Sequence, residues 1–223
     1  MELVHVLSRG VDKRKIFMDN QDYFRFIHDL FEFNDKERIN TTFYRFHRSN
    51  DIASRKIERK PRKLLVDIHT FCLMPNHYHL LLSAKVENAI PKFMKKLNMG
   101  YAKYFNQKYE RKGALFEGRY KSIPIKNDAH FIHIPYYIHL NPLDLITPEW
   151  RDRKLKNYKK AINFLNSYRW SSHMDYAGKH NFPSVTHREF LMEFFESSQE
   201  YNRNIKEWLK DLNLLDFENL LLE

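Results

Sequence analysis

Two histidines one residue apart, His77 and His79, stand in the stretch MPNHYHLLL between a Pro-Asn pair and a run of leucines. Alternate residues of a β-strand project from the same face, so we expect the two imidazoles to converge while Tyr78 points the other way. Two imidazoles at the mouth of a strand can share a divalent metal ion. A chance pair is the alternative, because the chain has 12 histidines.

A second group of polar side chains follows helical spacing in residues 128–142. One stripe of the helical wheel carries imidazole, phenol and amide groups, at His130, His133, Tyr137 and Asn141. The neighbouring stripe is apolar and should face a sheet; it consists of Phe131, Ile134 and Ile138. Such a helix could bring the polar stripe to the histidine pair. The alternative is that these polar groups face solvent.

Tyr137 stands out among the tyrosines of this region by its spacing from an amide. Of the six tyrosines between residues 90 and 145, it alone has a side-chain amide one helical turn later, at Asn141. Tyr136 has Leu140 in that place and lies about 100° around the helix. Pro135 inside the segment removes one helical hydrogen bond, and it is expected to kink the helix or shift its start.

Hydrophobic periodicity predicts the elements that must position these groups. Strands are expected at 3–10, 64–74, 77–83 and 114–125, with Gly118 as a bulge, and helices at 19–33, 88–110 and 128–142. The order β-α-β-β-α-β-α predicts an α+β fold, a ferredoxin-like sandwich in which helices cover one face of an antiparallel sheet. Residues 1–149 should form this domain. Residues 150–223, with helical periodicity at 187–195 and 201–215, should form a C-terminal helical extension.

The charge of the chain favours a polyanionic partner. Lysine and arginine outnumber aspartate and glutamate by 38 to 28, which gives a net charge of +10. Residues 45–63 hold eight lysines and arginines against two acids, where a short loop would suffice. We interpret this segment as a basic insertion that contacts phosphates through Arg55, Lys56, Arg59 and Lys60. A solvated linker is the alternative.

The remaining composition narrows the class of protein. A single cysteine, Cys72, excludes a disulfide framework and favours a reducing compartment. No apolar run reaches transmembrane length and the first residues lack a signal-peptide core, so we expect a cytoplasmic protein without membrane contact. The sequence has no P-loop and no G-x-G-x-x-G pattern, so nothing indicates a nucleotide cofactor.

Several motifs together resemble a known family. MPNHYHLLL (74–82), GRYKS (118–122) and YIHLNP (137–142), in this order, are similar to motifs of the single-tyrosine HUH transposases, in particular the REP-associated tyrosine transposases. HVLSRGVDKRKIF (5–17) and YRWSS (168–172) fit the same family, so the resemblance covers about residues 3–175.

The resemblance implies a mechanism. His77 and His79 would hold Mg²⁺ or Mn²⁺, with Asn141 completing the metal site. Tyr137 would attack a phosphate of single-stranded DNA near a short hairpin, leaving a 5′-phosphotyrosine and a free 3′-hydroxyl. His133 is a candidate for proton transfer.

The partners expected from this reading are DNA and, at most, a second copy of the chain. Arg9, Arg119 and Lys121 are expected to contact the DNA, and the protein should be a monomer or a homodimer. One alternative is a non-catalytic protein that binds single-stranded nucleic acid. Another is a metal-dependent hydrolase that uses the same histidines to activate water.

Overall fold

The structure is a computed structural model that describes residues 2–37, 62–126, 128–152 and 154–211, with the backbone alone given for 128–130 and 211. Most of the predicted basic insertion, including Arg55, Lys56, Arg59 and Lys60, lies outside the described residues.

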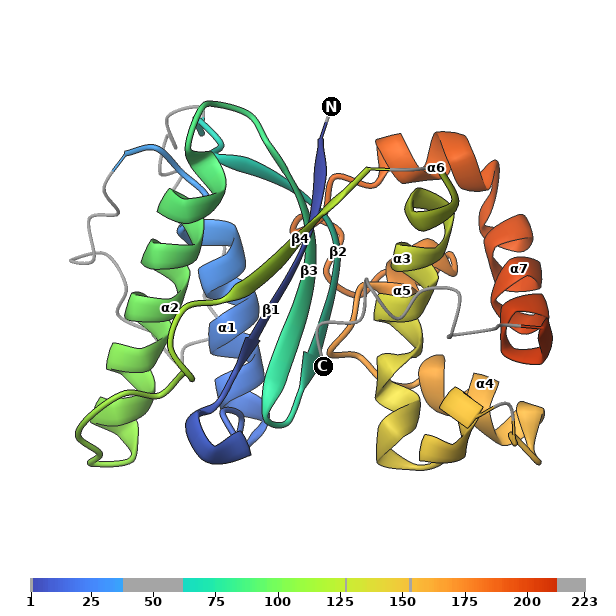
Figure 1. Cartoon of the computed structure of the whole chain (residues 1–223), viewed down its shortest axis with the longest axis horizontal. Coiled ribbons are helices and arrows are strands. Elements are labelled where there is room, and N and C mark those ends of the chain that lie inside the picture. Colours follow the sequence, from blue (N-terminus) through green and yellow to red (C-terminus); the bar gives the residue numbers. More distant parts are fainter. Residues whose placement is uncertain (1, 38–61, 127, 153, 212–223) are drawn as a thin grey trace, which may run out of the picture.

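Four strands form one antiparallel sheet at the centre of the molecule (Figure 1). They are β1 (Leu3–Arg9), β2 (Val66–Met74), β3 (His77–Ala84) and β4 (Lys121–Ile125), in the spatial order β2-β3-β1-β4. Pro75 and Asn76 connect β2 to β3 directly, as the turn-forming residues predict. The mixed architecture and the strand order confirm the predicted ferredoxin-like fold class.

Helices α1 (Asn20–Glu32) and α2 (Ala89–Lys108) cover one face of the sheet. α1 starts where the sequence predicts, because Asp19 and Asp22 form a reciprocal capping box. Side chains of both helices pack on the even-numbered residues of β3 in a core that includes Phe26, Leu30, Phe93, Leu97, Tyr78, Leu80 and Leu82.

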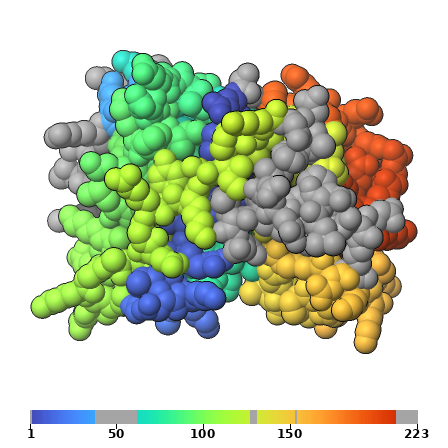
Figure 2. All heavy atoms as spheres, in the orientation of Figure 1, coloured from blue at the N-terminus to red at the C-terminus, as the bar shows by residue number. Residues whose placement is uncertain are grey.

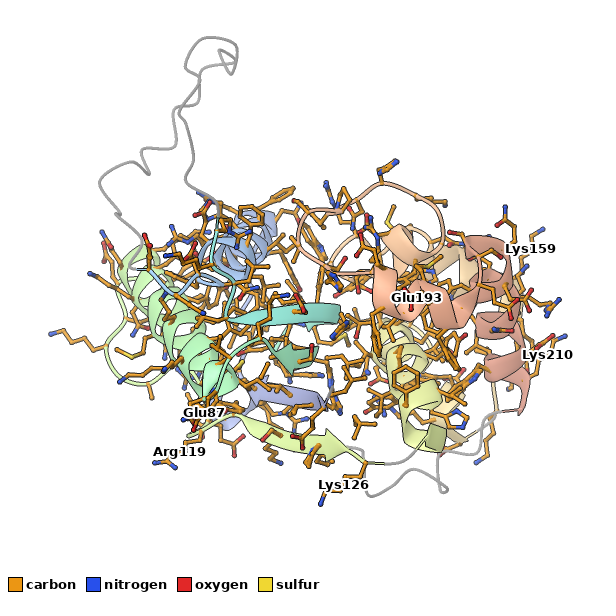
Figure 3. The ribbon with its side chains drawn as sticks, turned by 90° about the horizontal axis from the view of Figure 1, so that it is seen from above. Glu87, Arg119, Lys126, Lys159, Glu193 and Lys210 are labelled. Carbon is orange, nitrogen blue, oxygen red and sulfur yellow. The ribbon has the colours of Figure 1, made fainter. Side chains whose placement is uncertain are left out.

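The opposite face is also covered, although the sequence predicted helices on one face alone. α3 (Asp128–Leu140) lies against it, followed by the short 3₁₀ helices η3 (Asn141–Leu145) and η4 (Pro148–Asp152). Four more helices complete this side: α4 (Tyr158–Leu165), α5 (His173–Tyr176), α6 (Glu189–Phe195) and α7 (Ser198–Asp211). Figures 1 and 3 show the sheet between these two helical layers.

The C-terminal helices share a core with the sheet. A single cluster of buried residues joins Met74 and Leu81 of the sheet with Ile138 of α3, Phe195 of α6 and Ile205 of α7. The YRWSS segment extends the sheet edge, since the backbone N–H of Leu73 donates to the carbonyl of Trp170 at 2.9 Å. The described part of residues 150–223 therefore shares one apolar core with α3 and this face of the sheet.

Two local predictions differ from the structure. The fourth strand spans 121–125 and not 114–125, because the chain bends at Gly118, whose φ of +62° takes it out of extended conformation. Gly118 is thus a bend before the strand and not a bulge within it. Helix α3 starts at residue 128, where the periodicity predicts it, and continues through Pro135 to Leu140, so the proline does not shift the start of the helix. Near the N-terminus, η1 (Val11–Lys13) follows β1.

No helix in the described ranges has both the length and the apolarity that a membrane span requires.

Candidate functional site

Strand pairing places three histidines on the face of the sheet that α3 covers. In the antiparallel register of β1 and β3, His5 lies opposite Leu81, Leu7 opposite His79, and Arg9 opposite His77. His77 and His79 project from the same face, as predicted, with ring centroids 5.0 Å apart. Tyr78 points into the other core and donates a hydrogen bond to Asn98 there.

Hydrogen bonds fix which nitrogen each imidazole could offer to a metal. Nδ1 of His77 lies 2.7 Å from Oδ1 of Asn76, an acceptor, so this nitrogen carries the proton. Nδ1 of His79 lies 3.0 Å from Nε2 of His5, whose ring stacks on it with a centroid separation of 5.2 Å. Nε2 of His77 is therefore the atom suited to metal coordination, and Nε2 of His79 is suited to it in the tautomer whose Nδ1 donates to Nε2 of His5.

Tyr137 reaches the histidines from α3. Its ring packs edge-on against His79 at a centroid distance of 5.9 Å and against His5 at 6.1 Å. Tyr136 points elsewhere: it stacks on Tyr201 of α7 at 5.7 Å. Of the two adjacent tyrosines, Tyr137 is therefore the one that lies with the histidines. We call His77, His79 and Tyr137 the tyrosine–histidine site.

The guanidinium of Arg151, from η4, lies beside the phenol of Tyr137. Nη1 is 3.2 Å from the phenolic oxygen, and the guanidinium carbon is 5.4 Å from the ring centroid. Nη2 donates to Oδ1 of Asn141 at 2.9 Å. Nε donates to Oδ1 of Asp144 at 2.9 Å, and Nη2 also donates to Oδ2 of that carboxylate at 2.6 Å. A positive charge is thus held against the candidate nucleophile.

Asn141 and His133 take positions that the sequence did not anticipate. The amide of Asn141 donates to the backbone carbonyl of Tyr137 at 2.9 Å, and its oxygen accepts from Arg151. Asn141 is thus hydrogen-bonded to the arginine and to the backbone of its own helix. The ring of His133 lies 4.3 Å from that of Trp208 of α7, a contact typical of packing. The side chain of His130 lies outside the description.

The site is closed to solvent. His77 is 7% exposed, His79 is fully buried and Tyr137 is 2% exposed. Within the described residues, no three side chains of histidine, cysteine, aspartate or glutamate gather as a metal-binding group.

Three of the residues predicted to bind DNA come together near His77. Arg9, Arg119 and Lys121 line a cleft of about 130 Å³ with Glu117, and Arg9 is the strand partner of His77. Nε of Arg9 is buried without a hydrogen-bond partner in the described structure. Arg119 points outward (Figure 3), and Figure 2 shows the segment leading into β4 on the molecular surface beside the N-terminal residues. The cleft thus offers cationic groups next to the histidines.

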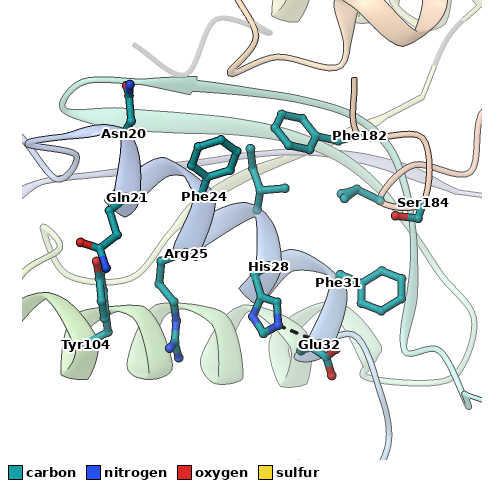
Figure 4. A pocket seen from close by; sticks show the side chains of 12 residues that line it. Asn20, Gln21, Phe24, Arg25, His28, Phe31, Glu32, Tyr104, Phe182 and Ser184 are labelled. Atoms are coloured by element: carbon teal, nitrogen blue, oxygen red, sulfur yellow. Dashed lines mark ion pairs between the residues drawn. The ribbon is translucent and has the colours of Figure 1, made fainter. Parts of the chain in front are cut away.

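A larger hollow lies on the other side of the sheet. It has a volume of about 810 Å³ and follows α1, with Phe24, Phe31, Tyr104 and Phe182 in its wall (Figure 4). The guanidinium of Arg169 stacks over Phe24 at 4.8 Å. None of the lining residues belongs to the tyrosine–histidine site, so the volume of this hollow does not identify it as the candidate functional site.

The sequence analysis missed His5 and Arg151. His5 could have been found, because the alternation of LVHVLSRG places it on one face of an expected strand. Arg151 follows a proline in a segment without helical or strand periodicity, so no pattern in the sequence indicates where its side chain points.

Two comparisons find known proteins to which the chain is similar. The family model described as "Transposase IS200 like" matches residues 27–141, just over half of the chain. A solved structure of a REP-associated tyrosine transposase bound to a REP hairpin is similar at a TM-score of 0.44 and 12% identity, over 82% of this chain and 84% of the other. Among curated proteins, none matches the chain.

Proposed function

The chain belongs to the IS200-like transposase family, and from this premise we propose that it cuts and rejoins single-stranded DNA through Tyr137. The observation that carries the proposal is the meeting of Tyr137 with His79, at a ring separation of 5.9 Å, from elements far apart in sequence. The motifs MPNHYHLLL, GRYKS and YIHLNP favour the REP-associated branch, whose substrates carry a short hairpin.

In the proposed reaction Tyr137 is the nucleophile. Its phenolic oxygen attacks phosphorus, the bond from phosphorus to the 3′-oxygen breaks, and the phenolic proton is balanced by the one gained by the 3′-hydroxyl. Because one phosphodiester replaces another, a 3′-hydroxyl of a second DNA end can reverse the step. No nucleotide cofactor is needed for either direction.

His77 and His79 are the proposed holders of Mg²⁺ or Mn²⁺, through the Nε2 atoms. A bound divalent cation would withdraw charge from a non-bridging oxygen of the phosphate. Both cations prefer oxygen ligands. The two imidazoles would therefore supply part of the coordination shell, and oxygen atoms of DNA and water would supply the remaining ligands. Asn141 could join this set if its oxygen left Arg151, and its role as a ligand stays a prediction.

DNA access is proposed to involve movement around the site. Tyr137 and His79 are almost fully buried, so a phosphate can reach them when the segments that cover them shift. The Arg9–Arg119–Lys121 cleft would hold neighbouring phosphates, because cationic side chains supply most of the affinity for nucleic acid backbones. The role of the basic insertion at 45–63 stays a prediction, as does that of His133 in proton transfer.

The test is a search for the covalent intermediate. Single-stranded oligonucleotides with a short hairpin and randomised flanks carry a label at the 3′ end, since a 5′-phosphotyrosine retains that part of the strand. With Mg²⁺ or Mn²⁺, the wild type and the control variant Tyr136→Phe should give a labelled band that resists SDS. Tyr137→Phe should bind DNA and give no such band.

Each alternative predicts another outcome of this experiment. A non-catalytic DNA-binding protein would bind the oligonucleotides and form no adduct in any variant. A hydrolase using activated water would cut DNA without a protein-linked product. An adduct that persists in Tyr137→Phe would show that another residue is the nucleophile.

A further inference from the structure

Arg151 enters the site from beyond the segment that the transposase family model matches, which ends at residue 141. It contacts the phenolic oxygen of Tyr137 directly, at 3.2 Å, and its guanidinium also lies near the face of that ring. Nothing in the mechanism proposed above assigns it a part.

We propose that Arg151 is a catalytic residue that stabilises negative charge on the oxygen of Tyr137. This inference rests on the proposed function, since it concerns the same nucleophile. A phenol that attacks phosphorus loses its proton, and the charge that develops on its oxygen is favoured by a fixed cation within hydrogen-bond distance. The same oxygen is the leaving atom when a 3′-hydroxyl reseals the strand, so Arg151 would assist both directions.

The guanidinium is held in a fixed orientation by its other contacts. The carboxylate of Asp144 accepts from Nε and Nη2, a two-point pairing that sets the plane of the fork. Trp150 donates from Nε1 to the same carboxylate at 2.7 Å, which fixes the acid in turn. With these groups engaged, Nη1 is the nitrogen directed at Tyr137.

The surroundings strengthen the interaction. The side chain of Arg151 is 23% exposed and Tyr137 is 2% exposed, so the pair lies largely away from water, where charges act on each other more strongly than at a surface. The amide oxygen of Asn141 accepts from Nη2 of Arg151, and its amide nitrogen donates to the backbone carbonyl of Tyr137. Asn141 thus connects the arginine to the end of α3. The YIHLNP motif thus contributes both the nucleophile and a support for its cationic partner.

The balance of the step involves no further reagent. In the forward direction the bond between the oxygen of Tyr137 and phosphorus forms and the bond to the 3′-oxygen breaks. The proton lost by the phenol equals the proton gained by the 3′-hydroxyl, and Arg151 keeps its own charge throughout.

The experiment measures the rate of adduct formation in a single turnover, at saturating 3′-labelled oligonucleotide, for Arg151→Ala and Arg151→Lys. We expect the alanine variant to be slower by about 10²-fold, as for loss of one donor to a developing oxyanion. The lysine variant should recover part of that loss, because an ammonium can approach the phenol but cannot keep the two-point pairing with Asp144. Lys154→Ala is the matched control: it removes one positive charge three residues away, from a side chain that is 74% exposed.

Chemical rescue separates catalysis from structural support. Guanidinium ion at millimolar concentration should accelerate Arg151→Ala and leave the wild type and Lys154→Ala unchanged, because the ion can occupy the space left beside Tyr137. A rescued rate without a change in melting temperature supports the catalytic role.

Two results would overturn the inference in different ways. If the wild type forms an adduct at Tyr137 and both Arg151 variants match its rate, the role of Arg151 is wrong and the proposed function stands. If the wild type forms no adduct, both are wrong.

Discussion

Both faces of the central sheet carry an apolar core, but the two faces differ in where buried histidines lie. Toward α1 and α2, β3 presents Tyr78, Leu80 and Leu82 to an apolar core. Toward α3, the same strand presents His77 and His79. Within the described residues every buried histidine lies on this second side: His5, His69, His77, His79, His139 and His173. The alternation of residues along β3 thus places apolar side chains and Tyr78 on one face, and two imidazoles beside Leu81 on the other.

The polar groups on the α3 side are joined by hydrogen bonds. Ser172 lies 2.7 Å from Nε2 of His139, whose Nδ1 lies 2.7 Å from the hydroxyl of Tyr201. That hydroxyl is 2.9 Å from Nδ1 of His173, and Nε2 of His173 is 3.3 Å from the amide oxygen of Asn166. This chain ties α3 to α5 and α7. Both ring nitrogens of His139 and of His173 thus have hydrogen-bond partners, which lowers the cost of burying these two imidazoles.

The largest effects are expected from alanine substitutions at two adjacent residues of β3, one on each face of the sheet. His79→Ala should reduce metal-dependent adduct formation by more than the 10–100-fold typical of losing an outer-shell group, with a smaller effect on folding. Leu80→Ala, one residue along on the other face, should cost about 2–5 kcal/mol of unfolding free energy. The folded fraction of that variant should keep its rate of adduct formation. Urea unfolding and single-turnover assays measure the two quantities.

The prediction is contradicted if His79→Ala lowers the unfolding free energy as much as Leu80→Ala does. Equal losses of stability from both variants would mean that His79 serves the core as Leu80 does. Cleavage by the wild type that continues in the presence of a chelator would remove the metal from the proposal altogether.

The sequence predicted the residues that sit in local patterns better than it predicted the residues that contact them. His77, His79 and Tyr137 could be singled out as candidates because each sits in a local pattern, a strand for the histidines and a helix for the tyrosine. The partners His5 and Arg151 depend on which strands pair and on how the chain turns after α3, and neither follows from local periodicity. Likewise, the C-terminal helices were recognised individually, but their shared core with Leu81 and Met74 is a property of tertiary packing.

A second prediction concerns how stability depends on pH, because burial lowers the pKa of three histidines on the α3 side of the sheet. Burial lowers the pKa of His69 and of His173 to about 4 and holds the pKa of His139 well below its usual value. In the unfolded chain these groups bind protons below about pH 6.5, while in the folded chain they stay neutral. Their contribution to stability is therefore complete above pH 6.5 and falls as the pH drops toward 4.

The slope gives the size of this effect. Each such histidine should lower the unfolding free energy by about 1.4 kcal/mol per pH unit across that window. Urea unfolding between pH 7 and pH 5 measures it, above the range where most carboxylates titrate. His173→Gln keeps a polar group at this position and should reduce the slope of the unfolding free energy against pH by the contribution of one histidine. A variant with the slope of the wild type would mean that His173 does not stay neutral in the fold.

The smallest effect is expected from the surface charges that flank the site. If Arg9, Arg119 and Lys121 contact phosphates, changing all three to glutamine should lower the slope of log K against log salt by about 2, since each contact to a single strand contributes roughly 0.7. The matched control removes three exposed lysines from α4 and α7, Lys159, Lys206 and Lys210, two of which lie far from Arg119 in Figure 3. Both variants lose the same net charge, so a general loss of attraction would change both slopes equally.

A change confined to the first variant would place the DNA backbone beside His77, because Arg9 is its strand partner. Adduct formation at saturating DNA should survive in both, since Tyr137 and the histidines are unaltered. Equal slopes in the two variants would mean that the cleft beside β4 does not bind the strand, and that the positive charge of the chain acts on DNA from other surfaces.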